Sequence, residues 1–331
     1  MKKLINDPDD VVDEMLEGMV AAYPDRLRRL PDTGVLLRAD APVDGKVGVV
    51  SGGGSGHEPT HAGYLGEGML DGAAAGEVFT SPTADELEEM VAARDSGEGV
   101  LMVVKNYEGD VMNFETAGEM VELEGTDVAQ VVVDDDVAVE DSLYTSGRRG
   151  VCGTILVHKV AGAAAHRGDD LVDVQRVARK VIDNVGTMGT ALTSCVTPEK
   201  GDPTFELGED EIELGIGIHG EPGVERTGMM SADEITEELT TSVLADLDLD
   251  DGQEVVTIVN GMGGTPLSEL FIVNRKVQEL MDEHGLETWD AMVGDYMTSL
   301  DMMGCSVTVC AVDDELKELL AHPADTPALK R

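Results

Sequence analysis

The sequence predicts an α/β fold, with a three-layer first domain on a parallel or mixed sheet and a smaller α/β second domain. Three apolar runs of strand length, Lys46–Val50, Gly99–Val104 and Val128–Val133, each end in a polar stretch. Helical patterns alternate with these runs, as they do where crossover helices join parallel strands. Because parallel strands end at one edge of a sheet, the three polar stretches should lie together there.

The first domain is expected to span residues 1–184. It opens with an amphipathic helix at Val11–Ala22 and a short apolar run at Val35–Leu37. A glycine-rich loop should follow the strand Lys46–Val50, and a helix should begin near Pro59, since proline suits a first helical turn. Further helices are predicted at Glu86–Ala93, Val111–Leu123, Gly153–His166 and Asp170–Val185.

The pattern changes near Asn184, and the second domain is expected to span residues 185–320. Its predicted strands are Ile212–Ile218, Glu254–Val259 and a strand pair at Trp289–Val293 and Ser306–Val312. Its predicted helices are Ala232–Leu244, Leu267–His284 and Asp314–Ala321. The remaining tail, 321–331, is expected to return to the first domain.

The charge balance is strongly acidic: among 331 residues, 67 are acidic and 23 basic, for a net charge of −44. Repulsion among these acidic side chains destabilises a compact state in dilute buffer. In about 1 M salt the Debye length falls to roughly 3 Å, and the repulsion is screened. The composition therefore predicts a halophilic protein and argues against nucleic acid or an anionic membrane as partner. No run reaches the roughly 18 apolar residues of a membrane span and no signal peptide is recognisable, so a cytoplasmic protein is expected.

Two groups of side chains could hold a metal, but neither forms a clear ligand set. The cysteines, Cys152, Cys195, Cys305 and Cys310, lack Cys-x-x-Cys spacing and are expected as buried free thiols. The triplet Asp134–Asp136 could bind a divalent ion. Because no further ligands are apparent, a structural or helix-capping role is favoured for it.

A glycine cluster that leads to a histidine, Ser51–His57, is the stretch around which the first domain is organised. Glycine lets backbone N–H groups approach a small polar ligand closely. The cluster lacks the ending of a P-loop and the dinucleotide fingerprint, which disfavours nucleotide binding. His57–His61 fits the His-Glu-x-x-His zinc pattern formally, but Pro59 should leave His57 outside the helix. A ligand-facing His57 is favoured over one that only caps a turn.

The chain repeats this arrangement at Gly215–Gly223, where His219 lies among glycines and a Glu-Pro pair follows, as after His57. The two histidines are therefore expected to form two walls of one site. A neutral imidazole nitrogen can attack a ketone carbonyl and give a covalent adduct, and flanking glycines leave room for it. A capped or core histidine is the alternative.

Lys105 and Asp110 flank a tight turn at the end of the second predicted strand. Lysine can position a polar substrate, and a carboxylate that takes a hydroxyl proton contributes on the order of 10²–10⁴ in rate. Solvated loop positions are the alternative for both residues.

Several long motifs in a constant order give the chain a family resemblance. They are Ser51–Pro59, Glu77–Pro82, Lys105–Asp110, Asp134–Val139, Tyr144–Gly150, Gly215–Gly223 and Thr298–Met302. In these motifs, and from Lys2 to Leu329 overall, the chain resembles the K subunit of dihydroxyacetone kinase. Departures such as Glu108, where threonine is usual, leave the site residues in place.

The resemblance implies that His219 binds dihydroxyacetone covalently, as a hemiaminal at the ketone carbon. It also implies that His57 hydrogen-bonds the substrate and assists proton removal, and that Asp110 lies near the hydroxyl to be phosphorylated. The matching substrate-contacting positions are Gly54, Ser55, Gly56, His57, Lys105 and Asp110. The product would be dihydroxyacetone phosphate, with no cofactor or metal on this chain.

The resemblance further implies a homodimer that works with other subunits. Because the chain ends at Arg331 soon after the K-type ending, it resembles the stand-alone form. In that form a separate L subunit carries ADP and Mg and transfers the phosphoryl group, and an M subunit recharges the ADP from the phosphoenolpyruvate phosphotransferase system. Two different functions also fit the sequence: an ATP-dependent kinase with a separate nucleotide-binding chain, and a non-enzymatic ketone sensor that regulates transcription.

Overall fold

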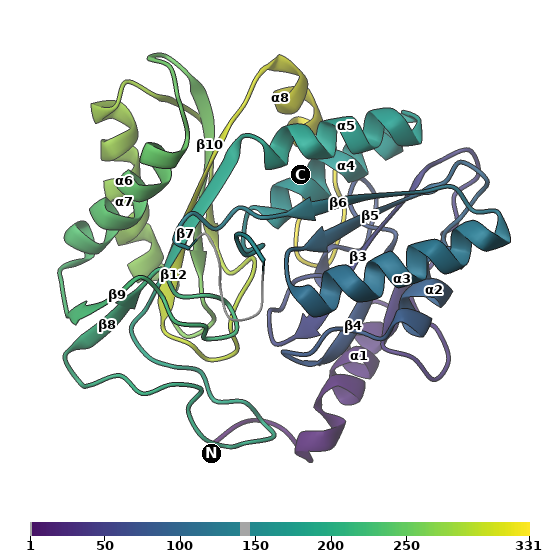
Figure 1. The fold of residues 1–331 in the computed structure, drawn as a ribbon, viewed down its shortest axis with the longest axis horizontal. Coiled ribbons are helices and arrows are strands. Elements are labelled where there is room, and N and C mark those ends of the chain that lie inside the picture. Colours follow the sequence, from purple (N-terminus) through teal and green to yellow (C-terminus); the bar gives the residue numbers. More distant parts are fainter. Residues whose placement is uncertain (1, 140–145) are drawn as a thin grey trace.

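The computed structural model describes residues 2–139 and 146–331, so Tyr144 and Thr145 of one motif lie outside the described residues. Two six-stranded sheets lie side by side, with helices on their outer sides and near their junction (Figure 1). None of the helices in the described part of the chain is long and apolar enough to cross a membrane.

The first sheet has the strand order β1-β2-β4-β3-β5-β6. Its strands are β1 (Leu27–Arg29), β2 (Val35–Arg38), β3 (Gly48–Ser55), β4 (Gly72–Val78), β5 (Val100–Lys105) and β6 (Val128–Val133). The four strands β4, β3, β5 and β6 are parallel, whereas β1 and β2 form an antiparallel edge. The polar stretches after β3, β5 and β6 therefore share one edge of the sheet, as predicted.

Helices cover both faces of this sheet. On one face α2 (Ala84–Ala92) and α3 (Glu108–Glu124) pack against apolar side chains of the strands. On the other face lie α1 (Val11–Ala22), α4 (Thr154–Arg167) and α5 (Leu171–Ile182). The predicted three-layer arrangement is thus confirmed for the first sheet.

The second sheet has the order β11-β10-β12-β7-β8-β9 and is mixed. Its strands are β7 (Val185–Ala191), β8 (Glu211–Leu214), β9 (Glu225–Gly228), β10 (Glu254–Gly261), β11 (Glu287–Gly294) and β12 (Gly304–Ala311). The helices α6 (Ala232–Asp246) and α7 (Leu267–Glu283) pack on its outer face, and α8 (Asp314–Ala321) follows the last strand (Figure 1). Two short 3₁₀ helices are η1 (Pro8–Asp10) and η2 (Ala62–Tyr64).

The glycine cluster is not the loop that the sequence predicts, because β3 continues through it to Ser55. Its neighbours explain this: Gly52, Gly53 and Gly54 are in register with the small residues Ala74–Gly76 of β4. A β-carbon at Gly52 would lie 2.8 Å from the carbonyl oxygen of Ala74. The glycines therefore permit close strand packing while the chain remains extended.

Two predicted helix boundaries near the site are wrong. No helix begins at Pro59; turns lead instead to the single 3₁₀ turn Ala62–Tyr64, which ends because Leu65 adopts an extended conformation. The helix α3 begins at Glu108 rather than Val111, which places Asp110 in its first turn instead of in a loop.

Predictions in the second half of the chain also need correction. The segments near Trp289 and Ser306 are strands, but they are not paired with each other, because β10 lies between them. β8 ends at Leu214, since Gly215 adopts a left-handed φ of 74°. Val185 belongs to β7 rather than to the preceding helix.

The helix α4 is buried along twelve consecutive residues, from Thr154 to Ala165. One apolar cluster joins α4 to side chains of both sheets, including Val103 of β5 and Ile258 of β10. A helix buried all round is expected in the interior rather than at the surface.

The boundary between domains 1–184 and 185–320 stays a prediction. The tail contacts the first sheet's side of the molecule, where Ala328 N–H donates to the Gly63 carbonyl at 2.9 Å.

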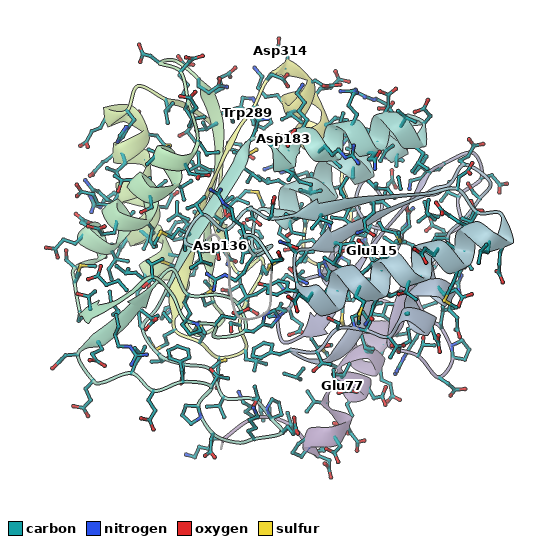
Figure 2. All side chains as sticks on the ribbon, in the orientation of Figure 1. Glu77, Glu115, Asp136, Asp183, Trp289 and Asp314 are labelled. Carbon is teal, nitrogen blue, oxygen red and sulfur yellow. The ribbon has the colours of Figure 1, made fainter. Side chains whose placement is uncertain are left out.

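Acidic side chains cover much of the surface. Glu77, Glu115 and Asp314 are exposed, whereas Asp136 lies inside the molecule between the sheets (Figure 2).

The expected buried thiols are confirmed, since all four cysteines are buried and free.

Gly162 and Gly18 are both helical glycines, and we expect opposite effects when each is changed to alanine. A β-carbon at Gly162 would collide with the backbone of Met69, so Gly162→Ala should lower the free energy of unfolding by about 1–3 kcal/mol. Nothing lies within 4 Å of a β-carbon at exposed Gly18, so Gly18→Ala should raise it by about 0.5–1 kcal/mol. Urea unfolding in high salt measures both; effects of the same sign would contradict the packing described for α4.

Candidate active site

Four aromatic rings from separate segments meet where the two sheets adjoin. His57 follows β3, Phe79 follows β4, Tyr107 follows β5, and His219 lies beyond β8. The ring centroids of His57 and His219 are 4.7 Å apart, and those of Tyr107 and His219 are 4.6 Å apart. Phe79 stacks on His57 at 5.1 Å and meets His219 edge-on at 5.2 Å. The structure thus brings together the two histidines that the sequence places in one site.

His219 is held by Glu221. Its Nδ1 lies 2.8 Å from Glu221 Oε1, and its backbone N–H donates to Oε2 at 2.9 Å. A carboxylate only accepts hydrogen bonds, so Nδ1 carries a hydrogen, and Nε2 is the nitrogen with a free lone pair when the ring is neutral. This is the form of imidazole that can act as a nucleophile.

Glu221 remains ionised although its side chain is 1% exposed. Burial alone would raise the pKa of this carboxyl group, but His219 and Arg149 outweigh burial and hold the pKa at about 2. A permanent carboxylate therefore faces the ring of His219 and stabilises positive charge on it.

His57 has a similar arrangement with a neutral acceptor. Its Nδ1 lies 2.8 Å from the carbonyl oxygen of Thr298, which can only accept, so the ring hydrogen is on Nδ1. Its Nε2 is buried and has no hydrogen-bond partner among the described residues. Burial and the nearby His219 and Lys105 hold the pKa of His57 well below its usual range, so the ring is neutral.

Lys105 and Asp110 form a buried ion pair on the same edge. Lys105 Nζ lies 3.1 Å from Asp110 Oδ2, and the two side chains are 1% and 3% exposed. The other oxygen of Asp110 accepts a hydrogen bond from the hydroxyl of Ser81. Together with the histidines, the site offers a nucleophilic nitrogen, a second bare nitrogen and a carboxylate that can accept a proton.

Comparisons with known proteins show the family of the chain. Residues 17–328 match the family described as Dak1 domain. The chain is 51% identical over 329 residues to the "PTS-dependent dihydroxyacetone kinase 1, dihydroxyacetone-binding subunit DhaK" of Listeria innocua, covering 99% of this chain and 100% of the relative. It is 46% identical to the "PEP-dependent dihydroxyacetone kinase, dihydroxyacetone-binding subunit DhaK" of Escherichia coli, covering 99% of each.

The chain belongs to the Dak1 family. Among solved structures it resembles the dihydroxyacetone kinase of C. freundii, with a TM-score of 0.90 and 32% identity over 98% of this chain and 60% of that chain. It also resembles a protein described as "Dihydroxyacetone kinase operon co-activator Dha-DhaQ", with a TM-score of 0.88 and 36% identity over 95% of this chain and 96% of that one. The family that the motifs predict is therefore confirmed.

The predicted substrate contacts Gly54, Ser55 and Gly56 lie at and just after the end of β3 in this Dak1 chain. A β-carbon at Gly54 would lie 2.6 Å from the Thr80 nitrogen, and a β-carbon at Gly56 would lie 2.8 Å from the Phe79 ring. Neither glycine therefore tolerates a side chain. The Ser55 hydroxyl donates to the Gly76 carbonyl at 2.7 Å, and the Ser55 carbonyl oxygen accepts a hydrogen bond from the Phe79 N–H at 3.0 Å.

Five residues of this arrangement were not predicted as site residues: Phe79, Tyr107, Ser81, Arg149 and Glu221. Glu221 carries a usable signal, since a Glu-Pro pair follows both histidines of the sequence. Ser81 and Arg149 lie in family motifs but have no chemical pattern of their own. Arg149 is fully buried, and its Nε lies 2.7 Å from Asp136 Oδ2 while its Nη2 lies 2.7 Å from the Gly215 carbonyl oxygen.

The aspartate triplet has the structural role that the sequence favours. Asp135 accepts hydrogen bonds from the N–H groups of Val151 and Gly153, at 2.7 and 2.6 Å, just before α4 begins. It also accepts one from the Thr187 hydroxyl at 2.6 Å. Within residues 2–139 and 146–331, no group of three or more His, Cys, Asp or Glu side chains could hold a metal ion.

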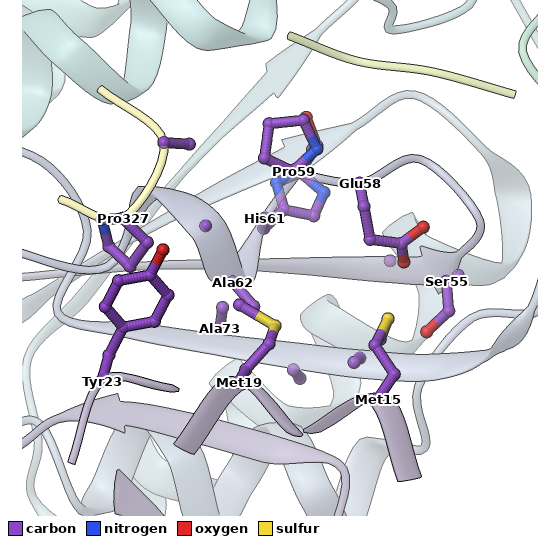
Figure 3. Close-up of a pocket in the computed structure, with 17 residues that line it drawn as sticks. Met15, Met19, Tyr23, Ser55, Glu58, Pro59, His61, Ala62, Ala73 and Pro327 are labelled. Atoms are coloured by element: carbon purple, nitrogen blue, oxygen red, sulfur yellow. The ribbon is translucent and has the colours of Figure 1, made fainter. Parts of the chain in front are cut away.

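A cavity of about 450 Å³ adjoins the site (Figure 3). Met15 and Met19 of α1, Ala73–Ala75 of β4 and Pro327 of the tail supply much of its lining. It also reaches Gly53–Ser55 and His61, but not His219, His57, Lys105 or Asp110. The cavity therefore lies beside the cluster of His57 and His219 and is bordered by His61, whose Nε2 also has no hydrogen-bond partner among the described residues.

Glu221→Gln should make stability less dependent on pH. The folded-state pKa of about 2 lies below the ordinary value of 4.5, so ionised Glu221 contributes stability that is fully present above pH 4.5 and is lost as the pH falls through 2. The whole pH-dependent part should be on the order of 3 kcal/mol, of which roughly 2 kcal/mol is lost between pH 7 and pH 3. Urea unfolding of wild type and variant between pH 7 and pH 3 measures it, with exposed Glu115→Gln as control; a constant difference across this range would contradict the buried carboxylate.

Proposed function

We propose that this Dak1 chain binds dihydroxyacetone covalently and presents it for phosphorylation. It is the dihydroxyacetone-binding subunit of a phosphotransferase-system-dependent dihydroxyacetone kinase, a function supported by family relatives that match the chain over its whole length. The observation that carries the chemistry is the pair His219–Glu221, which holds a ring hydrogen on Nδ1 of His219 and leaves Nε2 as the nitrogen that can attack a carbonyl carbon.

The first step in this proposal is attack of His219 Nε2 on the ketone carbon. The new C–N bond forms as the carbonyl π bond breaks, and the carbonyl oxygen takes up a proton to give the hemiaminal. The ring gains positive charge during attack, and that charge lies against the carboxylate of Glu221, 2.8 Å from Nδ1. A polyol such as glycerol has no carbonyl carbon for this step and is not retained.

The second step is transfer of a phosphoryl group to a substrate hydroxyl. Asp110 accepts the hydroxyl proton while Lys105, at 3.1 Å, holds its carboxylate in place. His57 accepts a hydrogen bond through its bare Nε2 and assists proton removal. The backbone of Gly54, Ser55 and Gly56 borders the substrate. Reversal of the first step then releases dihydroxyacetone phosphate.

The phosphoryl group comes from other subunits in this proposal. An L subunit carries ADP with Mg, and an M subunit recharges the ADP from the phosphoenolpyruvate phosphotransferase system. The chain itself acts as a homodimer in the cytoplasm. Support comes from relatives whose names specify the dihydroxyacetone-binding subunit of a PTS-dependent or PEP-dependent kinase.

A second candidate function is a ketone sensor that regulates transcription, and the likeness to an operon co-activator is the observation that favours it. Covalent binding at His219 serves either function. Only the kinase needs a base at the hydroxyl, so Asp110 separates the two.

Replacing His219 by alanine should abolish covalent binding, because only its Nε2 can form the C–N bond. We expect carbon NMR of dihydroxyacetone labelled at the ketone carbon to show a protein-bound tetrahedral carbon with the wild-type chain in high salt and none with His219→Ala. Circular dichroism checks that the variant is folded. A ketone signal that is unchanged by both proteins would overturn the covalent mechanism.

Asp110→Asn should separate binding from catalysis. The variant keeps His219 and Glu221, so the tetrahedral carbon signal should persist. Loss of the base should lower phosphoryl transfer in the assembled kinase by roughly 10²–10⁴-fold. Turnover that equals that of wild type would exclude Asp110 as the base, whereas absence of transfer even with the wild-type chain and its partner subunits would favour the sensor.

A further inference from the structure

Three polar side chains converge on the glycine that precedes the predicted substrate contacts. A β-carbon at Gly53 would collide with the ammonium group of Lys105. It would also lie 3.3 Å from Asp110 Oδ2 and 3.4 Å from His61 Nε2. Lys105 and Asp110 belong to the proposed catalytic set. His61 also faces Gly53 at close range, but it has no role in that set.

His61 is held behind the site by its other ring nitrogen. Its Nδ1 lies 3.1 Å from the Ser51 hydroxyl oxygen and 2.9 Å from Nε2 of His158. The ring is 6% exposed, and its partners lie on β3 and on the buried helix α4. The orientation of the ring is therefore fixed by two of the most enclosed elements of the fold.

The hydrogen bonds of Ser51 determine which ring nitrogen of His61 carries the hydrogen. The carbonyl oxygen of Val103, 2.7 Å away, can only accept, so the Ser51 hydroxyl hydrogen is directed to it. Ser51 Oγ then offers only lone pairs to His61. A hydrogen on His61 Nδ1 satisfies both this oxygen and Nε2 of His158, whereas a hydrogen on His158 Nε2 would leave the lone pairs of Ser51 Oγ and His61 Nδ1 facing each other at 3.1 Å. Burial and the neighbouring Lys105 and His158 hold the pKa of His61 well below its usual range, so the ring has no second hydrogen.

His61 Nε2 is consequently an unprotonated acceptor inside the protein. It is buried and has no hydrogen-bond partner among the described residues. Buried polar atoms in folded proteins are nearly always paired, and one that is not calls for a missing donor. The cavity of Figure 3 is lined by both Gly53 and His61, so a small molecule can lie beside them.

We propose that His61 is a further substrate-binding residue, whose Nε2 accepts a hydrogen bond from a hydroxyl group of the bound ketone. This inference rests on the proposed function, since dihydroxyacetone supplies the hydroxyl. A hydroxyl donates to a bare nitrogen, whereas a simple ketone has no hydrogen to donate, so His61 favours hydroxyketones over ketones of similar size. His61 would then join Lys105 and Asp110, the other two side chains that face Gly53, in holding the substrate.

Nitrogen NMR of the histidine-labelled chain tests the proposal directly. Without ligand, His61 should show a protonated Nδ1 and a bare Nε2. On addition of dihydroxyacetone, the Nε2 resonance should move toward that of a hydrogen-bonded acceptor. If the labelled ketone carbon and His219 respond to dihydroxyacetone but His61 does not, this inference is wrong and the proposed function stands. If none of them responds, the proposed function fails and the inference fails with it.

A matched pair of variants gives an independent measurement. In His61→Asn the shorter amide can replace Nδ1 toward Ser51 but leaves nothing at Nε2, whereas in His61→Gln the longer amide can reach the Nε2 position. Calorimetry should show roughly tenfold weaker binding of dihydroxyacetone to His61→Asn than to wild type, with partial recovery in His61→Gln. Thermal unfolding checks that both variants fold. Wild-type affinity in His61→Asn, or equal losses in the two folded variants, would overturn the assignment.

Discussion

The site depends on a buried series of charges that runs from Asp136 through Arg149 to Glu221 and ends at His219. Arg149 has no exposed surface, and its charge is balanced by Asp136 on one side and by Glu221 on the other. Removing one partner of a buried pair commonly costs about 3–5 kcal/mol, because it leaves the other charge uncompensated. The same charges have a chemical consequence: His219 and Arg149 keep Glu221 ionised, and ionised Glu221 holds a hydrogen of His219 on Nδ1. Stability and the orientation of the His219 ring therefore depend on the same side chains.

This arrangement requires both sheets to be in place. Asp136 lies between β6 of the first sheet and β7 of the second, and it forms a β-bridge with Thr187. On the opposite side of the site, Thr298 and Leu300 contact His57 and Gly56 through backbone hydrogen bonds of 3.3 and 2.8 Å. Because α4 is buried between these connections, the distance between the two histidine rings is set by packing of the whole molecule rather than by either loop alone.

Local sequence predicts the parts of this site that have a local cause. Alternating strands and helices place Lys105 on the correct sheet edge, and the repeated His and Glu-Pro arrangement pairs His57 with His219. The extended glycine run was not predictable from its own residues, because its conformation is imposed by β4, a strand with no strong apolar pattern. The role of Arg149 could not be predicted for a similar reason: both of its charged neighbours are distant in sequence and meet it only after folding. His61 looked like half of a zinc motif, and its true partners, Ser51 and His158, are defined by tertiary packing.

A strongly acidic chain presents a difficulty for imidazole chemistry, because a net charge of −44 attracts protons to histidine. The structure separates the two regions. Acidic groups such as Glu77 and Glu115 lie at the surface, where salt screens them over a Debye length of about 3 Å at 1 M. His57 and His61 lie in a buried region with low permittivity, beside the cation of Lys105, and both effects favour the neutral ring. Lys105 thus has a second role besides pairing with Asp110, since its charge helps to keep the rings of His57 and His61 neutral.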